Sequence, residues 1–447
     1  MTTPPRPDVF PDGRGKRVAA GIRRLAVDTT PLRRHRDFRL LWTGELISQT
    51  GSQITLVAVF IQVFQLTGSS AAVGIIGVAQ LGPLIVMTLL GGPLVDRIDR
   101  RRLMVVAAGG QAVASVVLLL GALAGRPHLL LVYVGAGLSG GLAGFSLSTR
   151  SATTPNTVPA SQLPQALALN QVMWQTCQIV GPAVGGLIVG SIGLSWAYGL
   201  DVASFAGAIV TALLMSPQPP RNGGSDTMGR ATTGWRGVVE GFRFLKGRRV
   251  LQTTFTADLI AMIFGMPRAL FPVLALTQFH RGEEVVGALF SAVAVGALLG
   301  ALTTGWVGRV RRQGLAVLVA VGIWGLGITA FGLVGDLLWL AFGCLAVAGA
   351  ADVISAVFRG TILQQSVPDD LRGRLSAVHI VVVAGGPRVG DFEAGVVASV
   401  FTPTVSVVSG GVICIVGVLA LAAAVPEFAR YESPERESPD PVEDGTA

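Results

Sequence analysis

Charged residues occur inside several long apolar segments of this chain, where a charged side chain is expensive. The stretch "GPRVGDFEAG", residues 386–395, places Arg388, Asp391 and Glu393 between two apolar runs. A charge at the centre of a bilayer costs about 2.5–3.5 kcal/mol on insertion scales, so such a residue faces a partner or a water-filled cavity. Five more charged residues occupy comparable positions: Glu45, Asp201, Asp258, Arg268 and Asp352.

The charges of this stretch are close enough to interact on a helix. Arg388 would lie roughly 21 Å along the helix axis from Arg374, near the midplane of a bilayer. Asp391 follows three residues later on the same face, so the two side chains are predicted to pair. Glu393 points nearly opposite Asp391 and needs its own partner or a protonated state.

Four helix breakers surround these charges: Gly385, Gly386, Pro387 and Gly390. They favour local unwinding. We hypothesise that Asp391 or Glu393 takes up and releases a coupling proton, while Arg388 modulates that acid or meets an anionic substrate. The alternative is a structural ion pair that locks the helix.

A polar stripe runs along the first apolar segment. Glu45, Gln49, Ser52 and Gln53 follow one another at helical spacing and share one face. On a membrane helix such a face is predicted to line a cavity. The alternative is that Glu45, low in its segment, only pairs with nearby basic groups.

The remaining intramembrane charges are isolated in sequence. Asp258 and Arg268 are ten residues apart, roughly 15 Å along a helix, so they cannot pair directly. Arg268 either has a functional role within the membrane or extends its side chain to the outer membrane surface. Asp201 and Asp352 are single acids, for which a structural hydrogen bond and a proton-carrying role are both open.

The composition identifies the elements that must position these residues. Of 447 residues, 51% are hydrophobic and 13% are charged, and the mean hydropathy is +0.62, which is typical of an all-α polytopic membrane protein. A span needs about 20 apolar residues. Twelve spans are predicted, at 39–66, 70–91, 103–124, 129–149, 163–190, 194–215, 250–276, 285–307, 314–334, 338–360, 374–400 and 403–424.

The distribution of basic residues predicts the orientation. With the amino terminus inside, nearly all of the 34 Lys and Arg residues fall on the cytoplasmic side. This asymmetry predicts that both termini are cytoplasmic. The net charge of +8 therefore reports this bias and does not indicate nucleic-acid binding. The preference for Arg over Lys and the richness in Ala, Gly and Val suggest a bacterial genome, and hence a bacterial plasma membrane. The first 37 residues have no apolar core, so no cleavable signal peptide is expected.

Five regions are expected along the chain. Residues 1–37 are predicted to be a disordered basic segment, and 425–447 a disordered acidic tail. Two six-helix bundles, 38–215 and 249–424, are separated by a linker at 216–248. The linker ends in an amphipathic helix that should lie in the inner membrane interface.

The two bundles repeat one another in sequence. Val73-Gly74 precedes Gly92 at the spacing at which Val286-Gly287 precedes Gly305. Arg150 and Arg359 each lead to a Val-Pro pair, and "GPAVGG" at 181–186 matches "GPRVGD" at 386–391. Such an arrangement predicts a secondary transporter of two bundles, with its site at their interface near the midplane.

The loop "GGPLVDRIDRRRLM", residues 91–104, carries a dense set of polar and small residues: Gly92, Asp96, Arg97, Arg100 and Arg101. It resembles the loop-2/3 signature of the major facilitator superfamily, although Asp99 stands where that signature usually has Gly. The resemblance implies a gating latch, in which Asp96 and its arginines hold the cytoplasmic ends together with Arg150.

The stretch "GPAVGGLIVG" resembles the antiporter motif of the same superfamily. Gly181, Gly185, Gly186 and Gly190 form a small-residue packing face, and Pro182 would bend the helix. The resemblance implies tight packing against the other bundle, which seals one side against leak. Ordinary helix packing is the alternative.

Residues 47–77 and 257–276 narrow the resemblance to the enterobactin-exporter-like branch of drug and proton antiporters. The branch implies a proton-driven exporter of a small organic molecule such as a siderophore, drug or secondary metabolite. The protein is expected to be a monomer. An importer of the same fold, or a non-transporting assembly partner, is the alternative. No nucleotide-binding loop, metal-ligand cluster or nucleophile motif occurs, so neither a cofactor nor an enzymatic activity is expected.

Overall fold

The computed structural model describes residues 28–95, 97–125, 127–219, 235–367 and 369–432. These residues are helical, and the one pairing of extended backbone among them is an isolated bridge between Arg312 and Glu432. The apolar composition dictates this result, because backbone groups within a bilayer find hydrogen-bond partners only inside a helix or a closed barrel.

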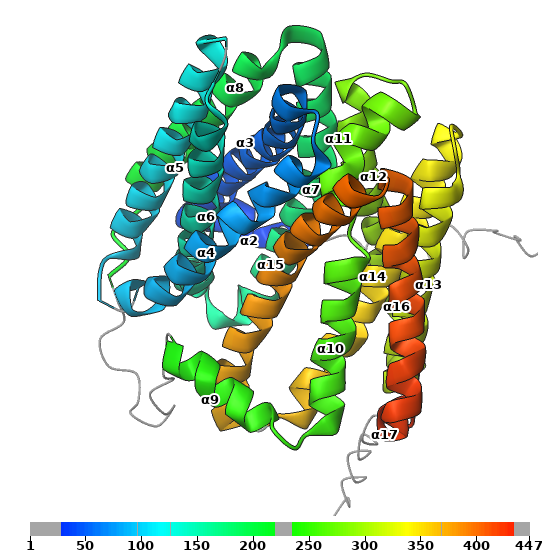
Figure 1. The fold of residues 1–447 in the computed structure, drawn as a ribbon. Coiled ribbons are helices and arrows are strands. Elements are labelled where there is room, and N and C mark those ends of the chain that lie inside the picture. Colours follow the sequence, from blue (N-terminus) through cyan, green and yellow to red (C-terminus); the bar gives the residue numbers. More distant parts are fainter. Residues whose placement is uncertain (1–27, 96, 126, 220–234, 368, 433–447) are drawn as a thin grey trace, which may run out of the picture.

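The first bundle lies on the left of Figure 1 and is coloured blue to green. It is preceded by a short helix, α2 (Thr30–Arg34). Its six long helices are α3 (Arg36–Thr67), α4 (Ser70–Val95), α5 (Arg100–Leu123), α6 (Leu129–Thr157), α7 (Leu163–Ile192) and α8 (Leu194–Leu214).

The second bundle follows the linker helix α9 (Trp235–Leu245). It begins with α10 (Arg249–Phe264), which continues through a 3-10 turn at Arg268–Leu270, α11 (Phe271–Val273) and a π-turn at Leu274–Gln278. Its other helices are α12 (Glu283–Leu302), α13 (Gln313–Leu333), α14 (Leu338–Ser366), α15 (Asp369–Val400), α16 (Pro403–Ala424) and α17 (Pro426–Ala429), with a 3-10 segment at Thr304–Arg309.

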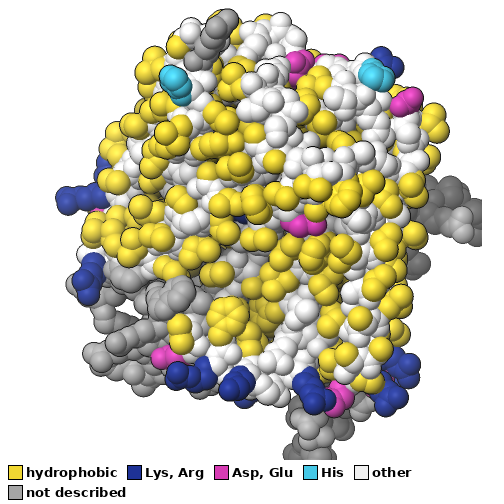
Figure 2. Space-filling view, viewed as in Figure 1, with side chains coloured by type: hydrophobic (Ala, Val, Ile, Leu, Met, Phe, Trp, Pro, Cys, Tyr) yellow, Lys and Arg dark blue, Asp and Glu magenta, His cyan; other side chains and the backbone are white. Residues whose placement is uncertain are grey.

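Eleven helical segments among the described residues are long and apolar enough to cross a membrane, judged by length and composition. The twelfth crossing is α15, which carries the charges of the 386–395 stretch and runs beside α4 and α10 (Figure 1). Figure 2 shows a broad hydrophobic band across the middle of this face, with basic side chains gathered near α9 and α17. The predicted twelve-helix, two-bundle fold is confirmed.

Two pairs of helices form the most extensive contacts between the bundles, α4 with α15 and α7 with α12. A Cβ atom on Gly74 would lie 2.7 Å from the carbonyl oxygen of Asp391, and one on Gly186 would lie 2.6 Å from that of Glu283. A Cβ atom on Gly287 would collide with the carbonyl oxygen of Pro182. The backbones therefore touch, because these positions have no side chain.

The two contacts are related by the internal repeat. Gly74 corresponds to Gly287, and Asp391 corresponds to Gly186, so each bundle contributes the same pair of positions. Both contacts involve the beginning of one helix and the end of the other. They lie at the end of the molecule opposite α2, α9 and α17, and the bundles are joined most closely there.

Both ends of the helical region extend further than predicted. Phe38 is fully buried, and α2 precedes it within the segment that was expected to be disordered. Beyond residue 425, α17 places Phe428 in the core, beside the backbone of Gly314. The remaining residues of the predicted tails, 1–27 and 433–447, lie outside the described part of the chain.

The expected amphipathic linker helix is present as α9, which packs against α15. Leu245 is buried in a small cluster with Leu251, Phe255 and Val378, at the start of α10 and the beginning of α15. The guanidinium carbon of Arg248 lies 3.5 Å from the ring centroid of Phe244, which adds a cation–π contact. The linker helix is therefore packed onto the second bundle at this end.

Candidate functional site

A cavity of about 840 Å³ lies between the two bundles. Residues from both bundles line it, from Glu45 and Arg150 at one end to Leu56 and Phe290 at the other. The far end is closed by aromatic rings: Phe290 packs edge to face against Phe60 and Phe271, with centroid distances of 5.8 and 4.9 Å. This volume accommodates a small organic molecule.

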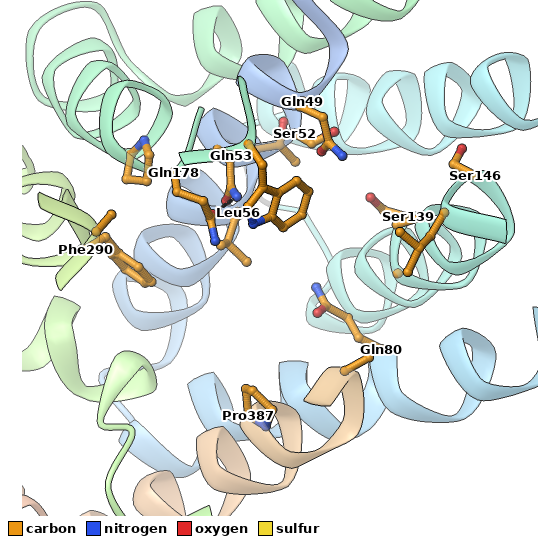
Figure 3. Close-up of a pocket in the computed structure, with 18 of the residues that line it drawn as sticks. Gln49, Ser52, Gln53, Leu56, Gln80, Ser139, Ser146, Gln178, Phe290 and Pro387 are labelled. Carbon is orange, nitrogen blue, oxygen red and sulfur yellow. Dashed lines mark hydrogen bonds between the residues drawn. The ribbon is translucent and has the colours of Figure 1, made fainter. Parts of the chain in front are cut away.

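The predicted polar stripe on α3 lines the cavity. Figure 3 shows Gln49, Ser52 and Gln53 on one face of this helix, across the cavity from Pro387 of α15. The Nε2 atom of Gln53 donates a hydrogen bond to Oε1 of Gln178 on α7. The cavity-lining interpretation of these four positions, Glu45 included, agrees with their placement.

Several lining residues were missed by the sequence reasoning. α7 contributes Gln171, Gln175 and Gln178, and α4 contributes Gln80. The three glutamines of α7 follow one another at helical spacing, so the test that found the α3 stripe would also have found them. The wall formed by the first bundle is thus rich in neutral amides, which can both donate and accept hydrogen bonds.

Glu45 and Arg150 form an ion pair within this wall, with 3.2 Å between Oε1 and Nε. Turned so that its amide oxygen faces Arg150, Gln49 accepts hydrogen bonds from Nη1 at 2.7 Å and Nη2 at 3.1 Å. Glu45 therefore both lines the cavity and pairs with a basic neighbour, and the two sequence interpretations describe one arrangement.

The second bundle contains a corresponding ion pair. From the sequence, Asp258 and Asp352 were identified as isolated acids, but Arg359 was not identified as their partner. Nη2 of Arg359 lies 2.8 Å from Oδ1 of Asp258 and 3.7 Å from Oδ1 of Asp352, while its Nη1 donates to Oγ of Ser355 at 2.9 Å. Arg359 occupies the repeat position of Arg150. Two carboxylates share one guanidinium, so one negative charge would be left uncompensated with both carboxylates ionised.

Asp391 pairs with Arg268, and the predicted pairing with Arg388 is wrong. Nη2 of Arg268 lies 2.7 Å from Oδ2 of Asp391, and its Nε donates to Oδ1 at 3.4 Å. The reason is the break after α10, where Pro267 interrupts the helix and redirects Arg268 toward α15. Asp258 and Arg268 do not pair with each other, in agreement with the prediction.

Arg388 lines the cavity without a carboxylate partner among the described residues. Its Nη1 atom donates to the carbonyl oxygen of Ala384 at 2.5 Å, one turn earlier on the same helix. Its Nε atom is buried and has no hydrogen-bond partner. Neighbouring Gly386 and Gly390 pack against Met262 of α10, and α15 continues as a helix through Pro387.

Glu393 and Asp201 lie away from the cavity wall. Glu393 is half-buried and forms no ion pair with a described residue. Asp201 is fully buried, and its Oδ2 atom accepts hydrogen bonds from Thr55 at 2.7 Å and Ser115 at 2.6 Å. Ser204 donates to its Oδ1 atom at 3.3 Å. Asp201 thus joins α3, α5 and α8 within the first bundle.

Asp201→Ala is expected to destabilise the first bundle by about 1–3 kcal/mol, because the buried hydroxyls lose their acceptor. Asp201→Asn keeps one acceptor oxygen and should lose less. Thermal unfolding of the purified protein measures both. Equal unfolding temperatures for Asp201→Ala and the wild-type protein would rule out a structural role for this cluster.

The loop that resembles the latch signature is anchored within the first bundle. Nη1 of Arg100 donates to the carbonyl oxygen of Ala152 at 3.0 Å, Arg101 donates to that of Leu213, and Arg97 is exposed. Gly92 belongs to α4, and Asp96 lies outside the described residues. Arg150 is turned into the cavity toward Glu45, so a latch through Arg150 stays a prediction.

The antiporter-like glycines divide between two neighbours. Gly186 packs against α12 of the other bundle, as the motif implied. Gly181 and Gly185 instead pack against Gln53 and Ile54 of α3, within their own bundle. Gly190 also faces α12, since a Cβ atom there would lie 3.3 Å from Oε2 of Glu284. The motif therefore contributes to both interfaces of α7, and two of its glycines lie at the contact between the bundles.

Known proteins resemble this chain over almost its whole length. A family model described as a transmembrane secretion effector matches residues 27–444. Enterobactin exporter EntS of Citrobacter koseri is 29% identical over 421 residues, which cover 93% of this chain and 96% of that protein. Enterobactin exporter EntS of an Escherichia coli strain is 29% identical over 407 residues, which cover 90% and 94% of the two chains.

Solved structures share the fold at low sequence identity. A point mutant of the nucleoside transporter NupG gives a TM-score of 0.71 at 13% identity, covering 87% of this chain and 99% of that one. A bacterial homologue of the iron transporter ferroportin, in an inward-facing state, gives 0.65 at 15% identity, covering 88% and 98%. This chain is a multi-pass membrane transporter that belongs to the transmembrane secretion effector family of the major facilitator superfamily.

Proposed function

We propose that this protein is a secondary active exporter of a small organic molecule, with a siderophore as the first candidate cargo. The observation that carries the proposal is the cavity of about 840 Å³ between two bundles that touch at one end through side-chain-free glycine contacts. Contacts of this kind can separate and re-form as the bundles rock, which is the requirement for alternating access. The 29% identity to enterobactin exporters supports export and a siderophore cargo.

The proposed orientation in the bacterial plasma membrane has both termini in the cytoplasm. The protein is proposed to act as a monomer. The positive-inside distribution of Arg and Lys supports this orientation. The touching ends of the bundles then face outward, and the cavity lies toward the cytoplasm, where an exporter loads its cargo. Untargeted mass spectrometry of medium and cells, with and without the gene, identifies the exported compound.

Collapse of the proton gradient separates export from import. Cells that express an exporter should then retain more of the identified compound, whereas cells that express an importer should contain less of it. Accumulation of the compound in the cells only while the gradient is intact would contradict the proposal. Enterobactin is the first compound to test, because the relatives named above are enterobactin exporters.

We further propose that the coupling proton binds to the carboxylates that share Arg359. Asp352 lines the cavity and its side chain is 29% exposed, so a proton can reach it, whereas Asp258 is buried behind it. A proton on either carboxylate removes the uncompensated negative charge. Asp391 is a weaker candidate because Arg268 already compensates its charge, and Glu393 lies off the cavity wall.

Asp352→Asn should reduce cargo-driven proton flux by about tenfold or more, the range expected for a residue that transfers protons. The measurement is acidification inside liposomes that contain purified protein and the exported compound. Glu393→Gln is the matched control and should behave as the wild-type protein does. Proton flux retained in Asp352→Asn but lost in Glu393→Gln would reverse the assignment.

A further inference from the structure

We propose that Arg388 and Arg268 form an anion-binding subsite at the closed end of the cavity, which holds an acidic group of the cargo. The inference rests on the proposed transport function and specifies the chemical class of its cargo. Both guanidiniums line the cavity. They come from α15 and from the turn after α10, so two helices of the second bundle build the subsite.

The local balance of charge is positive. Arg268 and Arg388 are accompanied by one carboxylate, that of Asp391, and its two oxygens are taken by Nη2 and Nε of Arg268. Arg388 has only the carbonyl oxygen of Ala384, and its Nε is buried without a partner. Arg388 is partly exposed to the cavity and forms no ion pair with a described carboxylate, so an anionic group that enters the cavity is expected to bind beside it.

The other charged residues of the cavity wall do not supply that anion. Glu45 is paired with Arg150 on α3 and α6. Asp352 lies beside Arg359 on α14. Neither acid forms an ion pair with Arg388 in the described structure.

The subsite is rigid at its base. The carbonyl oxygen of Arg388 is in such close contact with α4 that a Cβ atom on Gly77 would collide with it. Asp391 holds Arg268 through two hydrogen bonds, which fixes the direction of its guanidinium. The subsite therefore borders the contact that must open when the bundles separate, and the cargo would release its anion as that contact changes.

The surroundings restrict the kind of anion. A guanidinium fork matches the two oxygens of a carboxylate. Phe271, Phe290 and Trp324 supply apolar surface nearby, and the glutamines of the first bundle supply neutral hydrogen-bonding groups on the opposite wall. The cargo is therefore an organic acid with an aromatic or otherwise apolar body.

The test uses full-length protein in nanodiscs of phosphatidylcholine, which adds no net lipid charge. The probes are 2-hydroxybenzoate and the uncharged 2-hydroxybenzamide, and binding is read as a rise in unfolding temperature. The benzoate should raise the unfolding temperature of the wild-type protein and of Arg388→Lys. Arg388→Gln should bind the benzoate about tenfold more weakly, because it lacks one charged hydrogen-bonding partner. The benzamide should bind all three proteins equally.

The unfolding temperature without ligand distinguishes a loss of ligand binding from a loss of protein stability. Arg388→Gln should unfold at the same temperature as the wild-type protein or higher without ligand, because it removes a partly buried charge that forms no ion pair with a described residue. Arg268→Gln should unfold at a lower temperature, because it leaves Asp391 unpaired. Arg249→Gln, which removes a 67% exposed arginine, is the control and should change neither property.

Equal binding of the benzoate by Arg388→Gln and the wild-type protein, or wild-type binding that does not distinguish benzoate from benzamide, would overturn the proposal. Benzoate binding without any compound exported in the cellular experiment would refute the transport function and leave the subsite standing. Exported compounds that all lack an acidic group would refute the subsite and leave the transport function standing.

Discussion

Gly287→Val is expected to stop transport by keeping the bundles apart at the end where this structure joins them. A Cβ atom on Gly287 would collide with the carbonyl oxygen of Pro182 and lie 3.0 Å from the Cα atom of Gly186. Overpacking of this kind costs about 1–3 kcal/mol. Because the cost applies only to the joined state, it shifts the equilibrium between open and joined states by about 5- to 150-fold.

Spin labels on Thr67 and Phe401 measure this shift. Both residues are exposed at the joined end of the molecule, one in each bundle: Thr67 is the last residue of α3, and Phe401 follows α15. The labels require replacement of the three cysteines: Cys177, Cys344 and Cys414. In Gly287→Val the distance between the labels should lengthen, and uptake of cargo into inside-out vesicles should fall in proportion.

Gly343→Val is the matched control, because no neighbouring atom lies within 4 Å of a Cβ atom at that position of α14. Gly74→Val should reproduce the effect of Gly287→Val, since the internal repeat places Gly74 in the equivalent contact with α15. Normal transport by Gly287→Val, with an unchanged distance between the labels, would show that this glycine contact does not gate the cavity.

The second large effect is expected from the buried cluster around Arg359. Arg359→Met should destabilise the protein by about 3–5 kcal/mol, because it leaves Asp258 and Asp352 facing each other without a cation. The side chains of Arg359 and Asp258 are only 7% and 4% exposed, so water cannot replace the lost partner. The single substitution should therefore lower the unfolding temperature strongly.

A double substitution distinguishes lost charge compensation from lost packing. Asp258→Leu together with Arg359→Met replaces the buried pair with apolar side chains and should recover much of the stability. A thiol-reactive dye reports unfolding, because Cys177 and Cys414 are buried in the folded protein. Arg249→Met removes an exposed pair at 3.9 Å and should cost about 0–1 kcal/mol. Double-variant stability no better than that of Arg359→Met would indicate that packing, rather than charge, dominates.

The internal repeat of the sequence accounts for the similar positions of two ion pairs. Each bundle has an ion pair between its first and fourth long helices, at equivalent positions of the repeat. The first bundle has Glu45 with Arg150, and the second has Asp258 with Arg359. The repeat indicated the two arginines but not their partners. The extra acid, Asp352, has no counterpart, since Ala143 occupies the equivalent position of the first bundle.

The "GPRVGDFEAG" stretch could be matched to its repeat from the sequence, but the ion-pair partner of its aspartate could not be predicted. Its alignment with "GPAVGG" identified Asp391 as the counterpart of Gly186, and the structure places both positions at the contacts between the bundles. The partner of Asp391 was predicted within its own helix, as Arg388. The actual partner, Arg268, comes from another helix that is interrupted at Pro267.

The amino-acid sequence was sufficient to predict the twelve spans, the two repeated halves, the family and the polar stripe of α3. These properties depend on local hydropathy, helical periodicity and internal similarity, which can be read along one chain. The folded structure was needed to establish which charges pair, which glycines join the bundles and which cavity arginine has no ion-pair partner among the described residues. The reason is physical: an ion pair forms between atoms a few ångströms apart, and the helices that bring Arg268 to Asp391, or leave Arg388 facing the cavity, are fixed only when the bundles pack.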